Sequence, residues 1–205
     1  MNCPISHPPS HRTGNCYISM KATIVLLTLF FSTISIPLSA CSSSFSLPIP
    51  KPAIDYNERG TNKYQHGDTQ GAIKDYDRAI AIDSKYVEAY TNRAVAKLGL
   101  GDKKGAINDY NRAIDLDPQD ALIYYNRGVA KFELGDNRGA ISDFDRSISL
   151  NPQDAETYSN RGAVKLTIGD KKGAIADLNK GAKLFRQQGQ TADYNKTIEL
   201  IRQAK

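Results

Sequence analysis

Histidine and cysteine, the residues most often used for metal binding and nucleophilic catalysis, are scarce in this chain of 205 residues. Cys3, His7, His11 and Cys16 lie near the amino terminus, and their spacing matches no metal-ligand motif. His66 stands alone beside a glycine-aspartate pair, where a solvated turn residue is the simplest interpretation. The sequence therefore predicts no metal site and no cofactor.

Two other features could indicate chemistry. Asp115 and Asp117 are close enough for acid-base work, but they stand at the expected end of a helix, before Pro118. The stretch from Gly101 to Gly105 lacks the spacing of a Walker phosphate loop, and a turn explains it better. We therefore expect that the chain is not an enzyme.

Cys41 is placed where a covalent modification is expected. Lys21 precedes an apolar stretch over residues 22–36, and residues 38–41 are Leu-Ser-Ala-Cys. A basic residue, a short apolar run and small residues at a cleavage site are typical of a secretory signal peptide. Residues 38–41 also resemble the bacterial lipobox, which implies lipid attachment to Cys41 and cleavage before it. Ordinary cleavage after Ala40 and an uncleaved anchor are the alternatives.

This motif separates a leader from the body of the chain. Residues 1–40 are predicted to be a disordered leader and signal peptide, with Met20 as an alternative start, and residues 41–52 a Ser/Pro tether. We expect a cell-envelope protein, anchored by lipid to a bacterial membrane and facing the periplasm. A soluble periplasmic or secreted protein is the alternative.

A fixed spacing of 34 residues organises the rest of the chain. Four residue types recur at this spacing in four columns: Tyr56, Tyr90, Tyr124 and Tyr158; Arg59, Arg93, Arg127 and Arg161; Lys63, Lys97, Lys131 and Lys165; Asp75, Asp109, Asp143 and Asp177. A repeat of this length is a unit that buries its apolar face only against its neighbours, so stacked copies build one elongated core. Such architectures usually bind other molecules.

Each unit has the pattern of an antiparallel helix pair. In the third unit, apolar residues at helical spacing lie on both sides of Gly135-Asp136, and Pro152 stops the second stretch. Gly128 and Ala140 are small residues where the two helices must approach closely. The turn glycine suits a left-handed helix end, and the aspartate can accept hydrogen bonds from the amides that follow.

The third unit resembles the tetratricopeptide repeat (TPR), and the matching residues are Tyr124 in the place of Trp, Gly128, Ala140, Phe144 and Pro152. Two departures, Arg127 for Leu and Lys131 for Tyr, recur in all four units. The resemblance implies an all-α fold, a right-handed solenoid of four TPR hairpins over residues 53–188. Their bounds are 53–86, 87–120, 121–154 and 155–188.

Residues 189–205 are predicted to form a capping helix, because Tyr194, Ile198 and Ile201 follow a helical period within a polar run. The narrow apolar stripe and mixed charges favour packing on the last repeat over membrane binding.

The TPR resemblance implies a concave groove lined by the first helix of each pair, and its expected peptide-binding residues are Asn57, Tyr64, Thr91, Asn92, Tyr125, Asn126, Phe132, Ser159 and Asn160. Asn92, Asn126 and Asn160 form an amide column suited to a peptide backbone, with Tyr64, Tyr125 and Phe132 as anchors. The carboxylate clamp of chaperone-binding TPR domains is incomplete, because its basic positions are Asn57, Leu122 and Asn126 here. Packing between repeats is the alternative role for this column.

The arginine and lysine columns have two interpretations. Arg127 and Lys131 share one helix face, so the eight cations of the two columns are expected to line up along the stack. They form either an anion-binding track or a structural ladder with the aspartate column, and we favour the ladder because half-buried charges need partners.

Charge excludes one class of partner. Removal of Arg12 and Lys21 with the leader lowers the net charge from +5 to +3, and acids alternate with bases. This pattern is not typical of a nucleic-acid binder. We therefore expect a non-catalytic scaffold that binds a protein or peptide, and the resemblance to cyanobacterial TPR proteins adds photosynthetic-complex assembly as a candidate role. A self-assembling component that uses the repeat ends or the convex face is the alternative.

Overall fold

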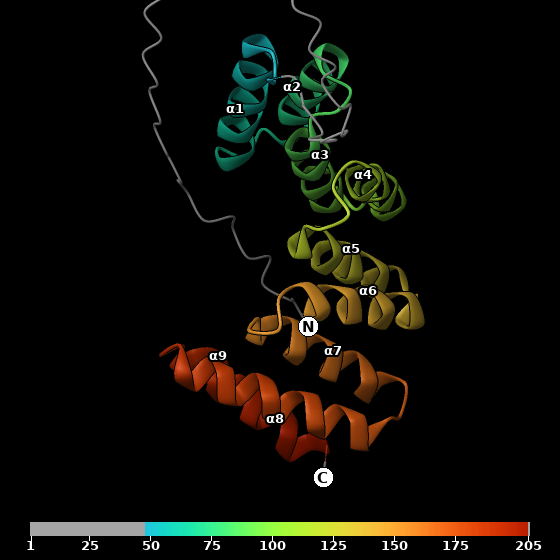
Figure 1. Ribbon diagram of the computed structural model, residues 1–205, viewed down its shortest axis with the longest axis vertical. Helices are drawn as coiled ribbons and strands as arrows, with labels where there is room; N and C mark the ends of the chain where they lie inside the picture. Colours follow the sequence, from blue (N-terminus) through green and yellow to red (C-terminus); the bar gives the residue numbers. More distant parts are fainter. Residues whose placement is uncertain (1–47, 205) are drawn as a thin grey trace, which may run out of the picture. The chain divides into compact units, whose positions relative to one another are not determined.

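In a computed structural model that describes residues 48–204, these residues form helices and no strands. The helices are α1 (Lys51–Gln65), α2 (Thr69–Ile82), α3 (Val87–Gly99), α4 (Lys103–Leu116), α5 (Ala121–Leu134), α6 (Asn137–Leu150), α7 (Ala155–Thr167), α8 (Lys171–Gln187) and α9 (Thr191–Ala204). Within this part of the chain, each helix packs against the next one in sequence (Figure 1). The predicted all-α solenoid of helix pairs is confirmed.

The turns within the four pairs repeat the same geometry. Gly67, Gly101, Gly135 and Gly169 all have positive φ, between 82° and 91°, as the predicted left-handed helix ends require. The aspartate that follows each glycine caps the second helix: Asp68, Asp102, Asp136 and Asp170 each accept a hydrogen bond of 2.9 Å from a backbone amide. Both turn predictions are confirmed.

The donors of these caps are glycines, which the sequence left unexplained. A Cβ on Gly71 or Gly139 would clash with the carboxylate of Asp68 or Asp136 respectively. The same clash exists in the other two pairs. The glycine therefore lets the cap close tightly over the helix end.

The core of each pair is one large side chain of the second helix, packed under a small residue of the first. Tyr76, Tyr110, Phe144 and Leu178 occupy this place and are buried. A Cβ on Gly128 would lie 2.7 Å from Phe144 Cε1, so the predicted need for a small residue there is confirmed.

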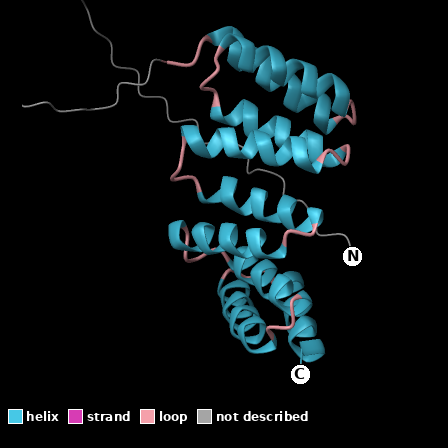
Figure 2. Cartoon of the chain, turned by 90° about the vertical axis from the view of Figure 1, so that its right-hand side faces the viewer, coloured by secondary structure: helices cyan, strands magenta, loops and turns pink. Residues whose placement is uncertain are grey.

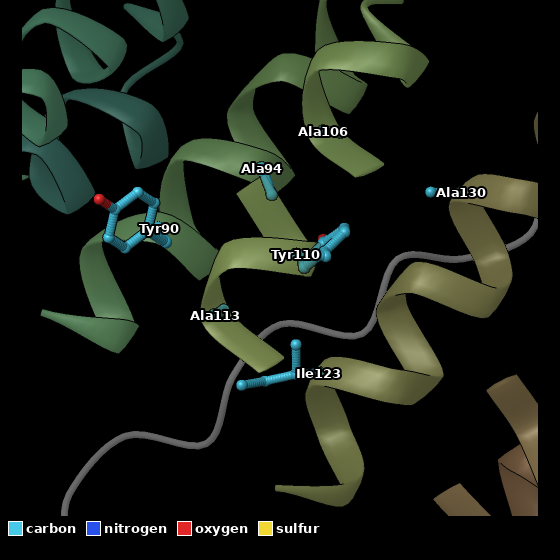
Figure 3. Close-up of a cluster of buried hydrophobic side chains, with 7 residues drawn as sticks. All are labelled: Tyr90, Ala94, Ala106, Tyr110, Ala113, Ile123 and Ala130. Atoms are coloured by element: carbon cyan, nitrogen blue, oxygen red, sulfur yellow. The ribbon is translucent and has the colours of Figure 1, made fainter. Parts of the chain in front are cut away.

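The core continues between repeats. Figure 3 shows one buried cluster that joins three helices: Tyr90 and Ala94 of α3, Tyr110 of α4, and Ile123 of α5 are among its members. Apolar burial of this kind couples each repeat to its neighbours.

The two ends of the described region differ from the internal repeats. α1 begins at Lys51, inside the predicted tether, because Pro52 is well tolerated in the first turn of a helix. α8 continues to Gln187, since no proline stops it. α9 then packs on α8 near the carboxyl terminus (Figure 2). Ile201 of α9 lies in one buried cluster with Leu178 of α8.

Among residues 48–204, no helix has the length and hydropathy needed to span a bilayer.

Candidate functional site

The first helices, α1, α3, α5 and α7, use two of their sides for packing. In α5, Gly128 faces Phe144 of the paired helix α6, and Ile123 packs with Ala113 of the preceding helix α4. The remaining arc is partly open and partly packed, since Tyr125, Val129 and Phe132 lie in or beside the cluster that contains Phe144 of α6 and Val164 of α7. We call this arc the first-helix face; in α5 it carries Leu122, Tyr125, Asn126, Val129, Phe132 and Glu133, with equivalents 34 residues away in the other repeats.

Asn57 lies at the centre of a polar network on this face. Its side chain is only 2% exposed. Its Nδ2 donates to Tyr86 Oη and to Glu88 Oε1, both at 3.2 Å, and its Oδ1 accepts a 3.0 Å bond from Asn92 Nδ2. Burial and the nearby Glu88 raise the pKa of Tyr86 to about 12, so this phenol stays protonated. Asn57 and Asn92 therefore connect the first repeat to the second.

Asn160 makes an equivalent link further along the stack. Its Nδ2 donates to Tyr125 Oη at 2.9 Å, which joins α7 to α5. Ser159 Oγ lies 3.3 Å from Thr197 Oγ1 of α9, so it belongs to the contact with the capping helix. Thr91 bonds its own helix, through Val87 O at 3.0 Å.

Asn126 differs from the other two members of the amide column. It is half-buried, and it has no hydrogen-bond partner among residues 48–204. The column therefore divides: Asn92 and Asn160 hold neighbouring first helices together, and the Asn126 amide makes no such link within residues 48–204.

The three predicted aromatic anchors also have different environments. Tyr125 is 5% exposed and its ring packs on Phe144, with centroids 6.0 Å apart. It lies in the core and is not an accessible anchor. Tyr64 and Phe132 are half-buried at the edges of two core clusters, so part of each ring faces outward.

The charges of the first-helix face all have one sign. Its positions carry Glu58, Glu88, Glu133 and Glu156, and no lysine or arginine. Glu133 pairs with Lys103, whose Nζ lies 3.9 Å from Oε2. The other three glutamates form no ion pair within residues 48–204. Burial raises the pKa of Glu156, although a hydrogen bond with Tyr125 opposes the rise.

The arginine and lysine columns point away from this face, toward the paired helices. Arg127 Nε and Nη2 lie 2.8 and 2.6 Å from the two oxygens of Asp143, and Lys131 Nζ lies 2.8 Å from Oδ2. The same set recurs at Asp75, Asp109 and Asp177. We call this arrangement the charged ladder. The predicted structural role of both columns is confirmed.

The arginines also connect successive repeats. Arg93 Nη1 lies 2.6 Å from Asp77 Oδ1 of the preceding repeat, and Arg127 Nη1 lies 2.7 Å from Asn111 Oδ1. Arg161 reaches Asp145 in the same way. The members of this acceptor column stand 34 residues apart, but the repeat pattern alone did not predict their role.

The tyrosine column supports the same arginines. Arg127 Cζ lies 5.5 Å from the centre of the Tyr124 ring, and Arg59 Cζ lies 4.8 Å from that of Tyr56. An arginine over an aromatic face gains a cation-π contact. The tyrosine that replaces Trp of the TPR pattern and the arginine that replaces Leu therefore contact each other in the structure.

These partners control the ionisation of the ladder aspartates. The hydrogen bond from Arg59 is the main cause that lowers the pKa of Asp75, and it outweighs the effect of burial. Burial acts to raise the pKa of Asp177, but hydrogen bonds from Arg161 and Lys165 prevail and lower it. Both carboxylates are therefore charged at neutral pH.

The remaining predicted chemistry is outside this face. Cys41 and the leader lie outside the described residues. His66 is exposed at the end of α1, with Nδ1 2.8 Å from Asn62 O. Within residues 48–204, no group of three or more metal-ligating side chains comes together.

Comparison with known proteins identifies the family. A profile described as "TPR repeat" matches residues 60–101 and 100–135, and one described as "Tetratricopeptide repeat" matches residues 121–154. The second TPR domain of human RPAP3, solved in complex with the HSP70 peptide SGPTIEEVD, is 30% identical, covers 56% of this chain and 95% of its own, and superposes with a TM-score of 0.54. The chain belongs to the tetratricopeptide repeat family. No match was found among curated proteins.

Two bacterial structures share the TPR fold over a larger part of the chain. MamA from Desulfovibrio magneticus RS-1 is 15% identical, covers 77% of this chain and 95% of its own, and has a TM-score of 0.64. PilF of Pseudomonas aeruginosa is 20% identical, with coverages of 75% and 77% and a TM-score of 0.59. At these identities the likeness concerns the fold alone.

Proposed function

We propose that this TPR protein is a non-catalytic scaffold that binds a segment of another protein along its first-helix face. The observation that carries the proposal is that this face keeps groups the stack does not use. Leu122 is 44% exposed, and Asn126 has no partner among the described residues. The RPAP3 domain, a relative with a peptide bound, supports a peptide ligand.

The charges of the face indicate the chemistry of that segment. Glu88, Leu122 and Glu156 occupy the same position of three successive repeats, so an exposed apolar side chain lies between two carboxylates. No cation on the face neutralises them. Charge complementarity therefore favours a segment that carries a basic residue on each side of an aliphatic one.

The stack sets the spacing of these residues in the ligand. Packed helix axes lie about 8–10 Å apart, and an extended chain rises about 3.3 Å per residue. One repeat therefore corresponds to about three residues of an extended ligand. We propose cations at positions i and i+6 and an aliphatic residue at i+3.

This preference differs from that of the RPAP3 domain, whose bound peptide SGPTIEEVD ends in an acidic run. A peptide with that ending would place its carboxylates beside Glu88 or Glu156. The carboxylates of the peptide and of the glutamates would repel each other, so we expect the acidic peptide to bind weakly or not at all.

The test measures the affinity of the full-length chain for two labelled peptides by fluorescence anisotropy. One peptide has Lys at i and i+6 and Leu at i+3, and the other has Glu in place of both lysines. We expect the basic peptide to bind, and Glu88→Gln with Glu156→Gln to weaken its binding about tenfold at low salt, because its ion pairs with the exposed Glu88 and the half-buried Glu156 are lost.

Asp115→Asn with Glu199→Gln is the matched control, since both residues are exposed and lie outside the first-helix face. This variant should bind like the wild type. Equal or tighter binding of the acidic peptide would exclude the proposed ligand class. If neither peptide binds and the protein self-associates at the same concentrations, the self-assembly alternative is favoured.

We also propose that the chain is exported and anchored to a bacterial membrane through lipid on Cys41. The signal-like run before Cys41 and the short Ser/Pro stretch after it support this proposal. In a bacterial host, the wild type should partition into a detergent phase with the membrane fraction. Cys41→Ser should move into the aqueous phase with normal helicity, and unchanged partitioning of this variant would contradict lipid anchoring.

A further inference from the structure

Three exposed aliphatic side chains stand at one position of the repeat. Leu100, Leu134 and Ile168 are 50%, 44% and 47% exposed, and each lies directly before the positive-φ glycine of a turn. None of them belongs to a buried cluster of the described helices. The first repeat has His66 at this position. The apolar side chains therefore follow the turns of the second, third and fourth pairs.

Basic residues follow the same turns. Lys104, Arg138, Lys171 and Lys172 are exposed in the first turns of α4, α6 and α8, and none forms an ion pair within residues 48–204. The aspartates nearby are already engaged, because each caps its helix by accepting a backbone N–H. We call these four cations and the three aliphatic residues the turn edge.

The cations are unfavourable for the helices that carry them. A helix amino terminus has a partial positive charge, so lysine or arginine in the first turn reduces helix stability. Asp102, Asp136 and Asp170 at the N-caps of α4, α6 and α8 offset part of this cost, although the first turns themselves contain no acidic residue. Unpaired cations nevertheless face solvent at three successive turns, beside the exposed aliphatic side chains.

We propose that the turn edge docks on an anionic membrane surface. Each helix packs against the next one within residues 48–204, so the three turns belong to successive pairs of one stack. Aliphatic side chains flanked by cations suit the boundary between headgroups and acyl chains. Nucleic acid is a poorer fit, because stacking on bases needs aromatic residues and the turn edge has none.

This contact is separate from the proposed peptide site. The turn edge shares no residue with the first-helix face, so a membrane-docked stack can hold its ligand at the same time. Docking also does not depend on lipid at Cys41, although a lipid anchor nearby would raise the local concentration of the turn edge at the surface.

The experiment uses the full-length chain with Cys3, Cys16 and Cys41 changed to Ser and a single new cysteine labelled with an environment-sensitive fluorophore. The label stands at Leu134→Cys on the turn edge, or at Leu122→Cys on the first-helix face as the control. A label on one residue reports local lipid contact, whatever the amino-terminal segment does. The probes are vesicles of phosphatidylcholine alone and vesicles in which about 30% of the lipid is phosphatidylglycerol. The second kind has an anionic surface and the first does not.

We expect a blue shift and quenching by lipid-embedded quenchers at Leu134→Cys on anionic vesicles, and neither at Leu122→Cys. Changing Lys104, Arg138, Lys171 and Lys172 to Gln should raise the vesicle concentration needed for half the shift by about tenfold or more. The matched control changes Lys74, Lys85, Arg112 and Lys180, which are exposed elsewhere, and should have little effect.

Three results would overturn the proposal. The first is a Leu134→Cys label that remains water-like on anionic vesicles. The second is an equal response on neutral vesicles or after the four cations are neutralised. The third is a shift produced without vesicles, by added DNA or by higher protein concentration, which would assign the turn edge to a polyanion or to self-association.

Discussion

At the scale of single residues, Tyr110 breaks the rule that buried polar groups are hydrogen-bonded. Its hydroxyl is buried and has no partner among the described residues, and burial raises the pKa of the phenol. The equivalent Tyr76 Oη donates to Thr61 Oγ1 at 3.3 Å. In the second repeat, Val95 stands in the place of Thr61, so the acceptor is missing. One substitution in the first helix therefore leaves the tyrosine of the second helix unsatisfied.

We predict that Tyr110→Phe stabilises the protein by about 1–2 kcal/mol, because it removes a buried hydroxyl without a partner. Tyr76→Phe is the matched control and should be neutral or slightly destabilising, since it breaks an existing bond. Chemical denaturation followed by circular dichroism measures both.

Val95→Thr extends this test, since it restores the acceptor. It should stabilise the wild type but destabilise the Tyr110→Phe variant, which a double-mutant cycle would show as a coupling between the two positions. Additive effects would mean that Tyr110 has another partner.

At the scale of helices, the charged ladder holds each pair together and joins it to the preceding one. Arg127 bonds Asp143 of its own pair and Asn111 of the preceding repeat, and it stacks on Tyr124. Within residues 48–204, the side chain of Arg59 has no preceding repeat to contact; it is 49% exposed, compared with 16% for Arg127. The arginine of this column therefore contributes more to stability inside the stack than in the first described repeat.

We predict that Arg127→Ala lowers the free energy of unfolding by about 2–4 kcal/mol, because it leaves Asp143 buried with Lys131 as its remaining cation. Arg59→Ala should cost less, in proportion to its exposure. Arg112→Ala is the control: it is exposed, has no ion pair among the described residues, and should stay within about 0.5 kcal/mol of the wild type. Thermal and chemical unfolding measure all three. An Arg127→Ala loss no larger than that of Arg112→Ala would return the column to the anion-track interpretation.

At the scale of the whole molecule, the repeat distributes charge among three separate places. The ladder cations neutralise the buried aspartates between helices, the glutamates remain on the first-helix face, and the unpaired cations of the turns form the turn edge. The modest net charge of the chain therefore does not describe how paired and unpaired charges are distributed over it. The peptide and vesicle experiments test these two surfaces independently, because a failure at one leaves the other unaffected.

Local patterns and the 34-residue repeat were enough to predict the helix pairs and their turns, and they favoured the charged ladder over an anion-binding track. Helical periodicity, a turn glycine and a capping aspartate act within a few residues, and columns at one spacing must come together when identical units stack. Which of the predicted groove residues are buried depends on contacts between helices that are distant in sequence. Asn57, Tyr125 and Asn160 meet partners about 30 residues away, and the small differences in packing that bury them have no signature in a local pattern. The missing partner of Tyr110 has the same cause, since it depends on which side chain the neighbouring helix presents.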